Sequence, residues 1–147
     1  MISLYSISKV FFIFNQKYYE DPPPAALLPV LEKVKLSYHL WYNYYQILPK
    51  THRHSLGIKI DKFFIDIIET ISIAGFLSKE EKRPWVRLAI RKTDVLKVLL
   101  MILWETKSLD DQKYIDLSLK IEEFGRDLGG WNGKLLKENS PAKTGEK

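Results

Sequence analysis

Residues 27–48 read LLPVLEKVKLSYHLWYNYYQIL, and the spacing of the large apolar side chains within them decides the fold class. These side chains recur in alternating steps of four and three residues: Leu27, Leu31, Val34, Tyr38, Trp41, Tyr45 and Leu48. A stripe of this kind, held over about three heptads, lies along one face of an α-helix. We therefore predict a helix of about 25 residues that ends at Pro49, because proline disrupts a helix interior.

A second helix is predicted directly after the corner at 49–55. Its apolar stripe consists of Leu56, Ile60, Phe63, Ile67 and Ala74. Ser55 or Thr51 is available as its N-cap. Four other apolar side chains lie off this stripe, so we expect the helix to be buried on more than one side; they are Phe64, Ile65, Ile68 and Ile73.

Two further helices are predicted in the second half of the chain. Ser78-Lys79-Glu80-Glu81 has the pattern of a capping box, and Pro84 places the start of the third helix proper near itself. The expected core stripe of this helix is Trp85, Leu88, Val95, Leu99 and Ile102. Residues 108–111 cap the fourth helix, whose stripe is Tyr114, Leu117, Ile121, Phe124, Leu128 and Trp131.

Four amphipathic helices with short connections predict an all-α, antiparallel up-and-down four-helix bundle. The bundle is expected over residues 25–136, with an N-terminal appendage at 1–24 and a polar C-terminal tail at 137–147. The chain is expected to fray from about Asn132 onward. Gly125, Gly129 and Gly130 are expected to allow close backbone approach near Trp131.

The composition allows one ordinary domain. The chain has 147 residues, 46% of them apolar, and its lack of cysteine excludes disulfides, a thiolate nucleophile and a cysteine-based zinc site. A net charge of +5 and a pI of about 9.3 permit a polyanionic partner without requiring one. The apolar run VFFIF at 10–14 is too short to span a bilayer, so we expect a soluble, cytoplasmic protein without membrane association.

The corner reads KTHRHSLG at 50–57 and admits three interpretations. His52 and His54 point about 200° apart on a helix, which argues against a shared metal ion. Near the N-terminus of the second helix, four basic residues are accompanied by one acidic residue, Asp61, and this excess of positive charge suits a bound anion. The basic residues are Lys50, Arg53, Lys59 and Lys62. The third interpretation, a tight structural corner in which Gly57 lets another backbone approach, is the one we favour.

The third helix carries the strongest basic pattern. Lys79, Arg83, Arg87 and Arg91 recur every four residues and therefore share a helical face, with Lys82, Lys92 and Lys97 nearby. Arginine suits bidentate contact with phosphate or carboxylate, although a solvated charged face explains the pattern equally well. Tyr42 and Tyr44 lie off the stripe of the first helix and are candidates for a subunit interface.

Nothing in the sequence indicates catalysis. Glu122-Glu123 and Asp110-Asp111 are adjacent pairs that point to different sides of a helix, and the Glu-x-x-His motif of a di-iron bundle is missing. We therefore expect no catalytic residue, cofactor or metal.

Three stretches, taken in order, resemble a known family. They are Pro49-Lys50, Arg53, Ser55-Leu56-Gly57 and Lys59-Ile60 at the corner; Arg91-Lys92, Asp94, Leu96 and Leu99-Leu100; and Gly125-Arg126, Leu128 and Gly129-Gly130-Trp131. Over about residues 27–134 the chain resembles the four-helix-bundle family of Avd, the accessory variability determinant of diversity-generating retroelements. The same family includes proteins encoded in intervening sequences of bacterial 23S ribosomal RNA genes.

The resemblance implies a ring-shaped homo-oligomer, a pentamer, in which five copies multiply the mild positive charge into a strong field. It implies binding of reverse transcriptase and of template RNA or an RNA/DNA hybrid, in support of mutagenic cDNA synthesis without chemistry of its own. The interface then expected consists of Lys50, Arg53, Lys59, Lys79, Arg83, Arg87, Arg91, Lys92, Lys97 and Arg126.

The chain departs from the family pattern at several positions. Met101 and Trp104 stand where retroelement members tend to carry basic residues, His54 replaces an aromatic residue, and Asp127 replaces an apolar one. The alternative is therefore a structural, protein-binding bundle of the ribosomal intervening-sequence type with no nucleic-acid role.

Overall fold

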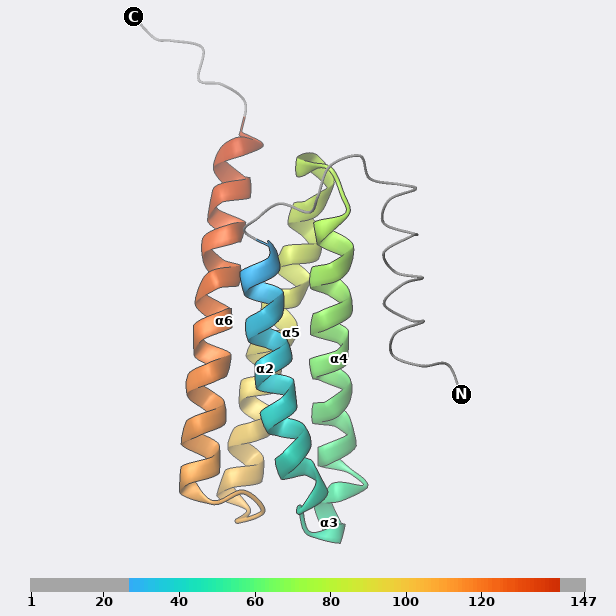
Figure 1. Cartoon of the computed structure of the whole chain (residues 1–147), viewed down its shortest axis with the longest axis vertical. Helices are drawn as coiled ribbons and strands as arrows, with labels where there is room; N and C mark the ends of the chain where they lie inside the picture. Colours follow the sequence, from blue (N-terminus) through green and yellow to red (C-terminus); the bar gives the residue numbers. More distant parts are fainter. Residues whose placement is uncertain (1–26, 141–147) are drawn as a thin grey trace, which may run out of the picture.

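The computed structural model describes residues 27–140, and these residues form five α-helices and no strand. The helices are α2 (Leu27–Gln46), α3 (Lys50–Arg53), α4 (Leu56–Gly75), α5 (Lys79–Glu105) and α6 (Asp111–Glu138). Figure 1 shows the four long helices side by side, with α3 at the end where α2 leads into α4. The principal contacts join α2 to α4 and α6, and α5 to the same two helices. The fold is therefore all-helical and packed as a bundle; the predicted appendage at 1–24 and most of the predicted tail lie outside the described residues.

The core confirms the stripes predicted for the first and fourth helices. In α2, Val34 and Trp41 of the predicted set are buried, while Leu31, Tyr38 and Tyr45 are half-buried against the core; Leu48, just after the helix, is buried as well. In α6, the predicted residues Leu117, Ile121, Phe124 and Leu128 are fully buried. Each of these two helices thus buries its apolar face in the core and exposes the opposite face to solvent, as the 3/4 spacing of its apolar residues indicates.

The predicted core face of α5 is wrong by about one residue, which is about 100° around the helix. Val95 and Ile102, expected in the core, are 43% and 38% exposed, and Trp85, Leu88 and Leu99 are only half-buried. The buried residues are instead Lys82, Val86, Ala89, Thr93, Leu96, Leu100 and Leu103. Small side chains at Ala89 and Thr93 let α5 pack closely, and stripe counting based on large apolar residues overlooks them.

The second helix is less enclosed than its sequence predicts. Ile60, Phe64, Ile67, Ile71 and Ala74 of α4 are fully buried. Of the off-stripe residues, Phe64 is fully buried and Ile68 packs against the core, whereas Ile65 and Ile73 remain 41% and 39% exposed, because the side of α4 away from its neighbours is uncovered in the single chain.

The helix ends differ from the predictions in three places. The first long helix stops at Gln46, and Pro49 is the N-cap of the short α3, which the sequence did not reveal. The third helix starts at Lys79 with Pro84 inside it, and the Ser78 side chain makes no capping bond. The last helix continues past Asn132 to Glu138 rather than fraying. The fourth-helix cap is confirmed, since Asp110 Oδ1 accepts a hydrogen bond from the Lys113 backbone N–H at 2.9 Å.

The two groups of glycines have opposite environments. A Cβ at Gly57 would lie 2.9 Å from the His52 carbonyl oxygen and 2.9 Å from Tyr45 Cε2, which confirms the close approach expected at the corner. The expectation for the last helix is wrong: within the described chain, nothing lies within 4 Å of a Cβ at Gly129 or Gly130, and Gly125 has only ordinary contacts.

We predict that Gly57→Ala destabilises the protein by about 1–3 kcal/mol, because the new methyl group forces the corner apart. Gly130→Ala is the matched control and should stabilise the protein by up to about 1 kcal/mol, since alanine is the better helix former and meets no neighbour. The free energy of unfolding in urea measures both. Equal effects of the two substitutions would contradict the packing described at Gly57.

Candidate nucleic-acid interface

The ten predicted interface residues do not form one surface. Lys50, Arg53 and Lys59 belong to α3 and the start of α4, whereas Lys79 and Arg83 open α5 at the opposite end of the bundle (Figure 1). Lys92 and Lys97 face different neighbours of α5, because Lys92 pairs with α4 and Lys97 with α6. Arg126 is exposed on α6.

The cations at the corner are partly engaged in the fold. Arg53 Nη2 and Nε donate hydrogen bonds of 2.8 and 3.2 Å to the Leu48 carbonyl oxygen, and so close the turn that follows α2. His52 Nδ1 is hydrogen-bonded to Ser108 Oγ, which ties α3 to the connection between α5 and α6. Lys59 Nζ lies 5.9 Å from the centre of the Phe63 ring. These contacts give the corner a structural role; Lys50 is exposed beside it.

Three of the four lysines of α5 contact carboxylates on the neighbouring helices; the fourth, Lys82, is buried, and burial lowers its pKa. Lys92 Nζ lies 3.1 Å from Asp66 Oδ2 on α4, and Lys97 Nζ lies 2.8 Å from Glu122 Oε1 on α6. Lys79 Nζ makes a longer contact of 4.0 Å with Glu138 Oε2. The more exposed pairs, those of Lys79 and Lys97, contribute little to stability, about 0–1 kcal/mol each, but all three pairs lower the local positive charge that an external anion meets.

The strongest of these pairings involves Asp66, whose side chain is only 21% exposed. Burial raises the pKa of its carboxyl group, but hydrogen bonds from Lys92 and Lys62 outweigh this and leave the pKa below its ordinary value. Lys92 also lies 5.5 Å from the centre of the Phe63 ring. Lys92 therefore joins α5 to α4, and its ion pair with Asp66 explains the presence of a lysine at this position without an external ligand.

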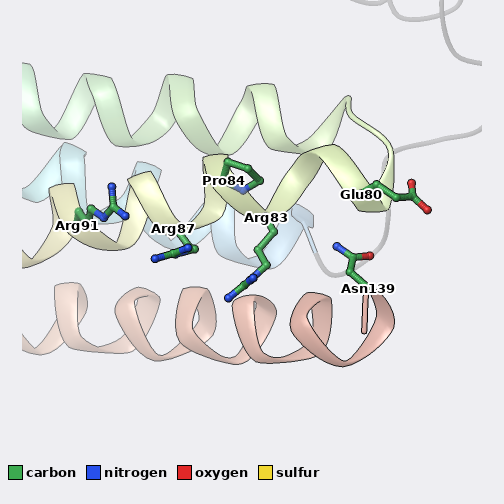
Figure 2. Close-up of a pocket in the computed structure, with 6 residues that line it drawn as sticks. All are labelled: Glu80, Arg83, Pro84, Arg87, Arg91 and Asn139. Atoms are coloured by element: carbon green, nitrogen blue, oxygen red, sulfur yellow. The ribbon is translucent and has the colours of Figure 1, made fainter. Parts of the chain in front are cut away.

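The three arginines of α5 differ from these lysines. Within residues 27–140, eight lysines have a carboxylate within 4.0 Å, whereas no carboxylate lies that close to Arg83, Arg87 or Arg91. The arginines line a groove of about 360 Å³ together with Glu80, Pro84 and Asn139. Figure 2 shows them following one another along α5, with Arg83 reaching toward α6 and the Glu80 carboxylate directed away from the three guanidinium groups. We call this feature the arginine groove.

Two buried polar atoms, one on α5 and one on α6, lack a hydrogen-bond partner within the described chain. They are Arg83 Nε and Asn132 Oδ1. Asn139, which closes the end of the groove, uses its Nδ2 to donate to the Lys79 carbonyl oxygen at 2.9 Å. An unsatisfied buried donor costs roughly 1–3 kcal/mol, and no acceptor in the described chain offsets this cost at Arg83 Nε.

A second hollow of about 350 Å³ lies on α2 and is lined by Tyr38, His39, Tyr42 and Asn43. Tyr38 packs edge-on against Phe64 with ring centres 5.9 Å apart, and burial, followed by the nearby Asp61 carboxylate, raises its pKa to about 12. Tyr42 is 51% exposed, and Tyr44 is half-buried beneath Lys113 Nζ at 5.9 Å. This hollow carries no cluster of charge and is not continuous with the groove on α5.

Sequence reasoning found the arginines but not the rest of the groove. Asn139 lies 60 residues from Lys79, so no local spacing could link them. In the described part of the chain, no three histidine or carboxylate side chains gather closely enough to hold a metal ion. Among residues 27–140, no helix combines the length and the hydropathy that a membrane span requires.

Comparisons of the chain with protein-family models, with curated proteins and with solved structures found no match. Any function assigned to the arginine groove therefore rests on its own geometry and on the sequence motifs above.

We predict that acid destabilises the protein partly through Asp66. Because its folded-state pKa lies below its ordinary value of 3.8, the stabilisation is complete above that value and is lost as the pH falls through the folded-state pKa. Asp66→Asn should therefore lower stability at pH 6 by up to about 1 kcal/mol and reduce the further loss between pH 6 and pH 3. Urea midpoints at the two pH values measure this. Glu69→Gln, an exposed change on the same helix, is the control and should behave as the unmodified protein.

Proposed function

We propose that this protein is a non-catalytic accessory of the Avd-like kind, which binds RNA through the arginine groove and presents it to a reverse transcriptase. The proposal is carried by one observation: Arg83, Arg87 and Arg91 are aligned on one face of α5, and within residues 27–140 none of them has a carboxylate partner. Guanidinium groups in this state are available for bidentate contact with phosphate.

The proposed interface contains fewer residues than the sequence predicts. Lys79, Lys92 and Lys97 are engaged by carboxylates, and Arg53 closes a backbone turn. Lys50, Lys59 and Arg126 remain as outlying cations that add to a long-range field without shaping a site. The three arginines therefore supply the specific contacts in this proposal.

In the same proposal the chain is an antiparallel up-and-down four-helix bundle that assembles into a ring-shaped homo-oligomer, a pentamer on the strength of the family resemblance. The uncovered apolar side chains support assembly. Val95, Val98, Met101 and Ile102 of α5, which we call the α5 apolar patch, are 38–49% exposed. Residues 95, 98 and 102 follow one another on a single helical face, and a contiguous apolar strip of this kind is typical of an interface.

The α5 apolar patch also favours a second candidate function, a structural bundle that binds only protein. Trp104, which replaces a basic residue of the family pattern, stacks on Tyr114 with ring centres 5.0 Å apart and donates a 2.7 Å hydrogen bond to Asp111 Oδ1. The end of α5 is thus built for packing rather than for phosphate contact. Nucleic-acid binding in this protein depends on the opposite half of the helix.

The first test is binding of a structured RNA to the purified protein by fluorescence anisotropy. The triple variant Arg83→Glu/Arg87→Glu/Arg91→Glu should lose at least about a hundredfold in affinity, because three phosphate contacts turn repulsive. The control Lys107→Glu/Lys120→Glu/Lys137→Glu changes the net charge equally at exposed positions outside the groove and should lose far less. If the two variants lost equal affinity for RNA, the loss would be explained by the change in net charge alone. Unchanged binding in both would favour the structural alternative.

A separate prediction concerns assembly. Val98→Asp/Ile102→Asp introduces two charges into the α5 apolar patch and should lower the mass of the assembly measured by sedimentation, while the helical circular dichroism of the chain is retained. Leu119→Asp, at a 64% exposed position of α6, is the control and should leave the mass unchanged. An unaltered mass in the α5 variant would exclude this patch from the subunit interface.

A further inference from the structure

The arginine groove differs from a pocket that closes around one anion. The three arginines lie in a row along α5 (Figure 2), and consecutive members are four residues apart, which corresponds to a rise of about 6 Å along the helix. This interval is close to the spacing of consecutive phosphates along one nucleic-acid strand. A row with this interval offers one guanidinium to each successive phosphate.

Carboxylates lie beyond both ends of the row. At the first end, Glu80 lines the groove beside Arg83, and Lys79, one turn before Arg83, lies 4.0 Å from Glu138 Oε2; at the other end, the exposed Asp94 follows Arg91 by about one turn. Beyond Asp94 the outward face of α5 becomes apolar at Val95 and Val98, which are 43% and 49% exposed. A phosphate is favoured opposite each of the three arginines and disfavoured on either side of them.

The groove is recessed at its Arg83 end. Arg83 is half-buried with its Nε inaccessible to solvent and Asn139 closes this end, whereas Arg87 and Arg91 are exposed. A duplex presents a stiff, convex backbone, which contacts the exposed Arg87 and Arg91 but reaches the recessed Arg83 guanidinium poorly. A single strand can bend its backbone into the groove and turn its bases outward.

We propose that the arginine groove is a track for single-stranded nucleic acid that engages three consecutive phosphates, with Arg83, Arg87 and Arg91 each holding one. This inference rests on the proposed RNA-binding function and narrows it to a strand type, a length and a place on the molecule. Bases are not read by the track, because the contacts are made to the backbone alone.

The test uses the full chain and oligouridylates from a dinucleotide to an octanucleotide, with a hairpin duplex for comparison. Affinity should rise with length until three phosphates are present and then level off, and the single strand should bind more tightly than the duplex. Three neutralised phosphates give a slope of log K against log salt of about −2, since each contributes roughly −0.7 for a single strand.

Single substitutions locate the track. Arg83→Gln, Arg87→Gln and Arg91→Gln should each weaken octanucleotide binding about tenfold and reduce the magnitude of the salt slope by about 0.7. Arg87→Lys keeps the charge and should preserve the slope while lowering affinity, because the fork of donors is lost. Arg126→Gln removes an arginine outside the groove and should lower the affinity and the salt slope far less than any groove variant, because Arg126 adds only to the long-range field. Urea unfolding of every variant shows whether the fold is retained.

The outcomes separate the track from the broader function. If structured RNA binds but the oligouridylates do not, or if Arg126→Gln weakens binding as much as the groove variants, the track is wrong and the proposed RNA-binding role stands. If neither nucleic acid binds and an acidic peptide does, both are wrong. A salt slope well beyond −2 for the octanucleotide would also overturn the limit of three phosphates.

Discussion

The buried indole of Trp41 fixes how α2 lies against α4, and the rest of the bundle depends on that placement. Trp41 is fully buried, so its N–H group needs a partner inside the protein, and Asp61 Oδ1 accepts its hydrogen bond at 3.2 Å. The ring also stacks on Phe64 with centres 6.2 Å apart and planes 21° from parallel. A shift of one residue between α2 and α4 would break both contacts, whereas purely aliphatic contacts would tolerate it better.

The sequence predicts a helix well where one face is apolar and the other is polar. This holds for α2 and α6, in which most residues of the predicted stripe are buried or packed against the core, although Leu36 of α2 and Leu119 of α6 lie off the stripe and are exposed. It fails for α5, because large apolar side chains occur nearly all round it and the residues that enter the core include small or polar ones, Ala89, Thr93 and Lys82. Thr93 Oγ1 donates to the Ala89 carbonyl oxygen at 2.8 Å, which satisfies its hydroxyl inside the helix and lets a polar residue be buried. The inner face of α5 therefore combines large apolar residues, such as Leu96 and Leu100, with small or polar ones that allow close packing.

The candidate site was predictable in position but not in composition. The four-residue spacing places Lys79, Arg83, Arg87 and Arg91 on one face, and the structure keeps the arginines there. Which cations are neutralised depends on carboxylates from other helices: Asp66 lies 26 residues before Lys92, and Glu122 lies 25 residues after Lys97. No spacing within one helix shows such pairs. A count of positive charge along α5 therefore overstates what an external anion can use.

The separation of the two basic ends limits how the charges can act together. The corner at α3 and the arginine groove lie at opposite ends of the bundle, and a 20-residue helix such as α4 is about 30 Å long. The Debye length at physiological ionic strength is about 8 Å, so the two groups are electrostatically independent within one chain. A short anion responds to one group at a time. Only a polymer long enough to run along the bundle, or an assembly that brings the ends of different copies together, can combine them. Because the outward face of α5 changes from arginine to apolar side chains partway along, such an assembly can bury the apolar half of the helix and leave the arginine groove open.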